Sequence, residues 1–144
     1  MVINKGLTGC GATTLAIDQD RDTLITVPYI SLINNKTSQK EHKDVLLGLH
    51  GTTKDGFRSA IQDYLAIHSR IKIMMTYDAL PIVCATLSAL GYDPYNTMHL
   101  VIDEWHLLFS HMDFRGDATK GVLREAPKFK MVTYLSATPI EKEY

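Results

Sequence analysis

The sequence lacks the features that mark several large classes of protein. It has two cysteines, Cys10 and Cys84, which are too few for a disulfide framework, so we expect a reduced, cytoplasmic (intracellular) setting. The longest apolar stretch, 80–90, is interrupted by Thr86 and Ser88 and is too short to cross a bilayer. The N-terminus has no apolar segment typical of a signal peptide. We therefore expect no membrane partner.

The sequence also has little excess charge of either sign. Its formal net charge is −1 at pH 7, so no general basic field indicates nucleic-acid binding, although a local patch could still provide it. We find no internal repeat and no low-complexity tract. The 144 residues, of which 45% are hydrophobic and 22% charged, are enough for one globular domain with a buried core. We expect residues 1–144 to form that single domain.

Strand-like and helix-like segments alternate along the chain. Apolar or β-branched stretches that predict strands occur at 2–3, 23–27, 45–49, 71–75, 98–102 and 131–135. Periodic patterns that predict helices occur at 31–35, 55–67, 80–90 and within 114–126. A polar, basic loop is expected at 36–43. This alternation predicts an α/β fold of three layers, with helices on both faces of a mainly parallel sheet.

One stretch combines an apolar strand with two acidic side chains. Residues 98–102 run into Asp103 and Glu104, which are followed by Trp105 and His106. Ligands bind at the carboxyl ends of strands in parallel sheets. Because successive strand side chains point to opposite faces, we expect different roles for the two carboxylates. One can hold Mg²⁺ while the other orients or deprotonates a water, as phosphoanhydride cleavage requires. The alternative is a strand that ends in a solvated acidic turn.

A glycine-rich segment follows the first short strand and precedes a helical pattern. Gly6, Gly9 and Gly11 let backbone N–H groups turn inward and bind an anion at the helix N-terminus. The spacing is that of a phosphate-binding loop with one departure, because Ala12 stands where lysine is usual. The hydroxyl of Thr13 is available for Mg²⁺. An ordinary turn is the alternative interpretation.

Together these segments resemble the first RecA-like motor domain of superfamily 2 helicases and translocases, the DEAD/DEAH-like group of P-loop NTPases. The resemblance covers nearly the whole chain. The segments that carry it are 6–14 (motif I), 27–28 (motif Ia), 76–80 (motif Ib), 103–106 (motif II, with Trp105 where alanine is usual) and 136–138 (motif III). Each is common alone, but their order and spacing together are specific.

The resemblance implies a role for each matched position. ATP and Mg²⁺ would be the cofactors, with Thr13 and Asp103 holding the metal and Glu104 activating the attacking water. Backbone amides would bind the phosphates along the loop formed by Gly6, Gly9, Cys10, Gly11, Ala12, Thr13 and Thr14. Coupling of the nucleotide state to DNA or RNA would involve His106, Ser136 and Thr138. Nucleic-acid contacts would come from the segments of Pro28, Thr76 and Tyr77.

Two features depart from the family pattern. At Ala12 the ammonium group that neutralises charge on the transferred phosphoryl group is missing, and losing one such donor slows a reaction roughly a hundredfold to a thousandfold. An engineered substitution, a natural loss of hydrolysis and a substitute cation remain open, with Lys5 the nearest candidate cation. Some phage DNA-packaging ATPases place their lysine at this upstream end of the loop, in a slightly different register.

The second departure is that the sequence stops soon after the motif III segment. We therefore expect part of a longer motor, whose second RecA-like domain completes the site, and weak hydrolysis by this chain alone. Besides a helicase or translocase domain, a viral DNA-packaging (terminase-type) ATPase domain and a degenerate, non-hydrolysing nucleic-acid-binding scaffold remain open. Retention of Thr13, Asp103 and Glu104 argues against the scaffold. A doubly wound domain without this activity is the plain structural alternative.

Overall fold

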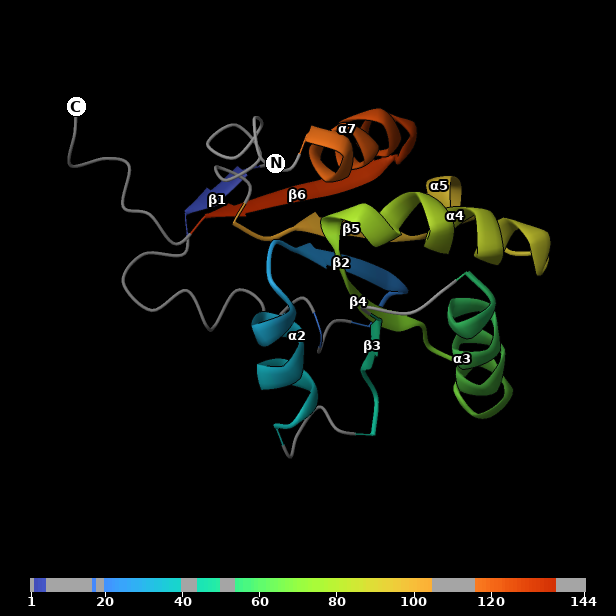
Figure 1. Ribbon diagram of the computed structural model, residues 1–144. Helices are drawn as coiled ribbons and strands as arrows, with labels where there is room; N and C mark the ends of the chain where they lie inside the picture. Colours follow the sequence, from blue (N-terminus) through green and yellow to red (C-terminus); the bar gives the residue numbers. More distant parts are fainter. Residues whose placement is uncertain are drawn as a thin grey trace, which may run out of the picture.

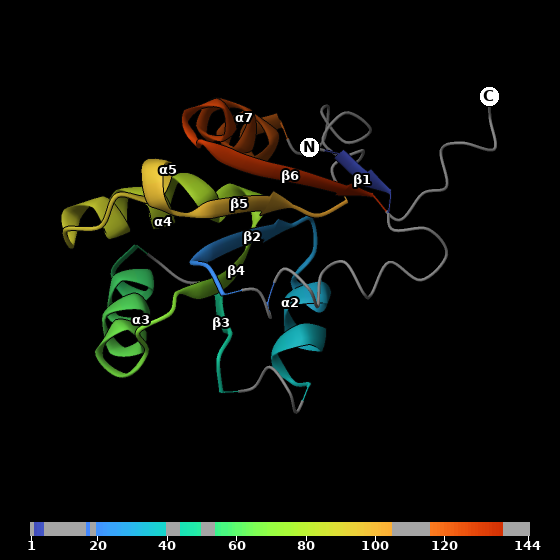
Figure 2. The same ribbon diagram turned by 180° about the vertical axis from the view of Figure 1, so that it is seen from behind.

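The computed structural model describes residues 2–4, 17, 20–39, 44–49, 54–104 and 116–136. These residues form a six-stranded sheet with the order β1-β6-β5-β2-β4-β3, in which every pairing is parallel (Figures 1 and 2). The strands are β1 (Val2–Asn4), β2 (Thr23–Val27), β3 (Leu47–Leu49), β4 (Lys72–Thr76), β5 (His99–Ile102) and β6 (Met131–Ser136). The helices are α2 (Ile30–Thr37), α3 (Lys54–Ile67), α4 (Leu80–Ala89), α5 (Pro94–Thr97) and α7 (Gly116–Glu125), with 3₁₀ turns η1 (Tyr77–Ala79) and η2 (Ala126–Lys128).

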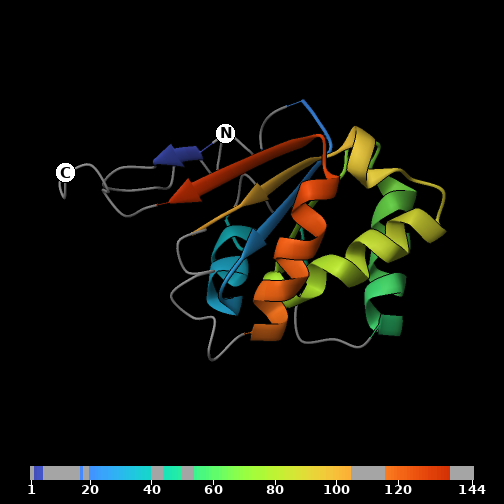
Figure 3. The ribbon, with the colours of Figure 1, turned by 90° about the horizontal axis from the view of Figure 1, so that it is seen from above.

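Both faces of the sheet are buried. The register pairs Leu24 with Ile73 and Ile25 with Met74, so neighbouring residues of one strand contribute to opposite faces. Leu24 and Ile73 belong to a large core with apolar residues of α3, α4 and α7, which lie along one face (Figure 3). Ile25 and Met74 belong to a smaller core with Ile33 of α2. This arrangement confirms the expected three-layer α/β fold of the RecA-like kind.

The element boundaries match the sequence predictions in most places and differ in three. The strand expected at 45–49 is limited to Leu47–Leu49 at the edge of the sheet. Lys36, expected in a basic loop, lies in the last turn of α2, where a positive charge interacts favourably with the helix dipole. The short α5 was not predicted, because four residues cannot show a helical period. In the described part of the chain, no helix is long and apolar enough to span a membrane.

Candidate functional site

The carboxyl ends of β1, β6, β5, β2 and β4 lie along one edge of the sheet. The register pairs Asn4 with Ser136, Ile102 with Tyr134, and Val27 with Thr76. In Figure 3 the arrows of β1, β6 and β5 point in the same direction. The segments that follow these strands in the sequence therefore leave from the same edge, where parallel sheets bind their ligands. We call this side the carboxyl edge.

At the carboxyl edge, β5 ends in a tight turn formed by Asp103 and Glu104. The Asp103 N–H donates to the carbonyl of Thr26 at 2.9 Å and extends the β5–β2 ladder by one bond. Glu104 then adopts a left-handed backbone with φ 55°. The Asp103 Oδ1 atom accepts a hydrogen bond from the Glu104 N–H at 3.0 Å. This bond fixes the orientation of the Asp103 carboxylate. Asp103 is only 5% exposed.

The turn, and not strand alternation, separates the side chains of Asp103 and Glu104. Strand alternation was expected to separate the side chains of Asp103 and Glu104, but β5 ends at Ile102, so alternation does not apply to them. Their difference comes from the turn itself, since Asp103 is buried and Glu104 is partly exposed. A left-handed conformation costs a residue other than glycine roughly 1–2 kcal/mol. Strain of this kind persists only where surrounding contacts hold it, and it concentrates at functional sites.

Tyr77 supplies such contacts from the end of β4. Its single hydroxyl proton is shared between the carbonyl oxygens of Asp103, at 2.7 Å, and Glu104, at 3.0 Å. One hydrogen bond contributes roughly 0.5–1.5 kcal/mol net, and a buried carbonyl left without a partner costs about 1–3 kcal/mol. The hydroxyl can therefore offset the backbone strain at Glu104. In the sequence, the only sign of this role is the position of Tyr77 directly after a buried strand.

The burial of Tyr77 bears on how the expected nucleic-acid contacts could be made. Tyr77 was expected to contact a nucleic acid, but its side chain is 2% exposed and its hydroxyl faces the acidic turn. Thr76 is 7% exposed, and Pro28 is buried as well. The 3₁₀ turn that contains Tyr77 packs against α7 and α4. Because these three side chains are buried, they have little surface with which to contact a nucleic acid.

The chemistry of the acidic turn fits Mg²⁺ better than a softer metal. Mg²⁺ takes oxygen ligands and is commonly held by one or two carboxylates together with substrate phosphates and water. Asp103 and Glu104 supply carboxylate oxygens only. Within the described residues no group of three or more histidine, cysteine or acidic side chains could hold a metal. A cation at Asp103 would take further oxygen ligands from beyond this set, and phosphate and water oxygens are the usual ones for Mg²⁺.

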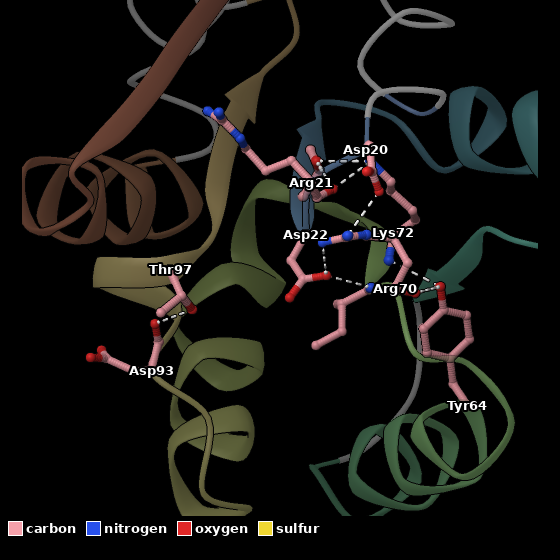
Figure 4. A network of polar contacts seen from close by, with 10 residues as sticks. Asp20, Arg21, Asp22, Tyr64, Arg70, Lys72, Asp93 and Thr97 are labelled. Carbon is pink, nitrogen blue, oxygen red and sulfur yellow. Dashed lines mark hydrogen bonds and ion pairs between the residues drawn. The ribbon is translucent and has the colours of Figure 1, made fainter.

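The opposite, amino edge of the sheet carries a separate polar network (Figure 4). Lys72 is 3% exposed, and its ammonium donates to the carbonyl of Arg21 at 2.5 Å and to Thr23 Oγ1 at 3.2 Å. The Tyr64 hydroxyl donates to the carbonyls of Val45 at 2.6 Å and Arg70 at 3.1 Å. Burial raises the pKa of Tyr64, so this hydroxyl keeps its proton. These bonds tie together the starts of β2 and β4, which is a structural role.

Several of the expected site residues lie outside the described residues. These are Lys5, all residues of the glycine-rich loop from Gly6 to Thr14, His106 and Thr138. Ser136 is placed as the last residue of β6, beside Asn4 of β1. The structure thus brings together the strand ends that lead into the predicted motifs and places Asp103 and Glu104 of the acidic turn. No protein-family model matches the chain, and a search of curated proteins finds no match.

Proposed function

We propose that this chain is the ATP-binding and ATP-hydrolysing motor domain of a nucleic-acid helicase or translocase of the superfamily 2, DEAD/DEAH-like kind. The observation that carries the proposal is the acidic turn of Asp103 and Glu104 at the carboxyl edge. This turn follows β5, next to the end of β6, and β1 pairs with the other side of β6. The glycine-rich loop follows β1 in the sequence, and the segment after Ser136 follows β6. DNA or RNA and a second RecA-like domain would be the partners, in the cytoplasm.

In this proposal the two carboxylates do different work. The buried Asp103 carboxylate, oriented by the Glu104 N–H, would hold Mg²⁺ together with Thr13. A bound Mg²⁺ would supply positive charge that neutralises the charge developing during phosphoryl transfer. The more exposed Glu104 would position the attacking water and accept its proton. Backbone N–H groups of the loop from Gly6 to Thr14 would bind the phosphates, with Lys5 as the substitute cation for Ala12.

The test is Mg²⁺-dependent binding of a fluorescent ATP analogue and single-turnover ATP hydrolysis by the 144-residue chain. We expect Asp103→Asn to remove the Mg²⁺-dependent part of binding. We expect Glu104→Gln to keep binding and to slow hydrolysis roughly 10²- to 10⁴-fold, the usual contribution of a general base. Glu125→Gln is the matched control, because it makes the same change at a buried carboxylate in α7. Absence of Mg²⁺-dependent nucleotide binding by the unaltered chain would reject the proposal.

Ala12 favours a second candidate, a non-hydrolysing scaffold that binds nucleic acid through the same surface. The variants Lys5→Ala and Ala12→Lys separate the two. Loss of nucleotide binding in Lys5→Ala would identify Lys5 as the working cation, as in a packaging-type ATPase. Tight nucleotide binding created only by Ala12→Lys would show that the loop as it stands does not bind nucleotide tightly. This result would favour the scaffold. Fluorescence anisotropy with labelled single-stranded DNA and RNA then tests the nucleic-acid partner in either case.

A further inference from the structure

The side chain of Tyr77 connects two strands that are not neighbours. Tyr77 follows β4, whereas the turn that its hydroxyl contacts follows β5, and β2 lies between them. Neighbouring strands are about 4.8 Å apart, so the two strand ends are separated by roughly 10 Å. Only a long side chain with a polar tip can cover this distance. The ring is 2% exposed, so packing fixes the direction in which the hydroxyl points.

The Tyr77 hydroxyl contacts the carbonyls of two consecutive residues, Asp103 and Glu104. This contact restricts the backbone conformation of the turn. Along an extended strand, successive carbonyl groups point in opposite directions, so a single donor cannot contact two in a row. At Glu104 the left-handed backbone, with φ 55°, turns the carbonyls of Asp103 and Glu104 towards the same donor. An extended Glu104 would lose at least one of the two bonds. The hydroxyl of Tyr77 therefore favours the left-handed form of the turn.

We propose that Tyr77 is a positioning residue, which holds Glu104 in the left-handed conformation and thereby sets where the Glu104 carboxylate stands relative to Asp103. The catalytic consequence rests on the proposed function, whereas the effect on the backbone does not. A displacement of about 1 Å in a reacting group can slow an enzyme roughly a hundredfold. Loss of the hydroxyl should therefore slow hydrolysis without weakening nucleotide binding.

The direct test is Tyr77→Phe, which removes the hydroxyl and keeps the ring. The matched control is Tyr64→Phe, because Tyr64 is also buried and its hydroxyl proton is also shared between two carbonyls, at the amino edge. The Tyr64 hydroxyl additionally accepts a hydrogen bond from the Lys72 N–H at 2.9 Å. The first readout is the set of NMR backbone chemical shifts of Glu104, which distinguish left-handed from extended backbone. The second readout separates kcat for ATP from the dissociation constant of the nucleotide.

We expect Tyr77→Phe to move the Glu104 shifts away from left-handed values and to lower kcat roughly tenfold to a hundredfold at an unchanged nucleotide dissociation constant. Tyr64→Phe should do neither, although it should lower the melting temperature to a similar extent. Unchanged Glu104 shifts in Tyr77→Phe would overturn the inference. A changed turn with unchanged kcat would overturn the positioning role. An unaltered chain without ATP turnover would count against the proposed function, and the NMR result would still decide the effect on the turn.

A second variant covers the case in which Tyr77→Phe does not fold. Glycine adopts the left-handed conformation without steric cost, so adding Glu104→Gly should restore the melting temperature of a Tyr77→Phe chain. A gain of several degrees beyond the one that Glu104→Gly gives the original chain would support the inference, since it couples the Tyr77 hydroxyl to the backbone at position 104. An equal or smaller gain in the Tyr77→Phe chain than in the original chain would overturn it.

Discussion

Replacement of Glu125 by glutamine should destabilise the protein in a pH-dependent way. Glu125 ends α7 and is 5% exposed. Its Oε1 accepts a hydrogen bond from the Tyr95 hydroxyl at 2.5 Å, and its Oε2 lies 3.4 Å from Arg124 Nε and from Lys128 Nζ. Burial alone would raise the pKa of Glu125, but the bond from Tyr95 and the charge of Lys128 outweigh it and lower this pKa below the ordinary 4.5.

The size of the effect follows from these contacts. A hydrogen bond to a charged group contributes about 1.5–3 kcal/mol, and roughly half of this is lost when the acceptor becomes neutral. Arg124 and Lys128 have side chains that are 62% and 51% exposed, so solvent screens their contribution to about 0–1 kcal/mol each. Glu125→Gln should therefore lower the free energy of unfolding by about 1–2 kcal/mol at pH 7.

The pH dependence gives the sharper test. Because the folded-state pKa of Glu125 is lower than 4.5, the stabilisation is fully present above the unfolded-state pKa and is lost as the pH falls through the folded-state pKa. Urea unfolding of the original chain and Glu125→Gln, followed from pH 7 to pH 3, should show two free energies that converge in acid. A difference that stays constant or widens as the pH falls would refute the assigned contacts. Tyr95→Phe should reduce the same pH dependence.

Two further predictions concern packing and thiol chemistry. A Cβ at position 48 would lie 2.6 Å from Ile33 Cγ2 and 2.9 Å from Thr37 Cγ2, so Gly48→Ala should cost about 1–3 kcal/mol in urea unfolding, and an unchanged midpoint would contradict the close approach of α2 to β3. Burial, followed by the nearby Glu125 charge, raises the pKa of Cys84 to about 12. Iodoacetamide at pH 8 should therefore leave Cys84 unmodified in the folded chain and modify it in urea, as peptide mapping would show, whereas modification in the folded chain would contradict its burial.

Local sequence signals were sufficient for much of the fold. The β-branched stretch 23–27 coincides with β2, and the helical period at 55–67 matches α3 within one residue. Gly91, predicted to end the helix at 80–90, has the left-handed φ of 97° that glycine allows. These signals succeed because each depends on the residues of one segment. The parallel sheet then follows from their alternation.

The details of the candidate site could not be predicted in the same way. The hydrogen bond between Tyr77 and Asp103 joins residues 26 positions apart, and no pattern within either segment indicates it. The left-handed backbone of Glu104 was also unexpected, since glutamate has no preference for it. The close approach of α2 at Gly48 is likewise a tertiary contact. Such features depend on which distant segments lie against one another in the folded chain, which one sequence does not reveal.

The turn at Asp103 and Glu104 has a consequence for any substitution at position 104. Glutamine removes the carboxylate charge but keeps the left-handed strain, so Glu104→Gln isolates the chemistry. Glycine removes the carboxylate and the strain together, so Glu104→Gly should stabilise the fold even as it removes the side chain that the proposed reaction uses. A residue whose removal increases stability while abolishing turnover is retained for its chemistry rather than for folding. The opposite result, a loss of stability in Glu104→Gly with turnover intact, would assign this turn a structural role only.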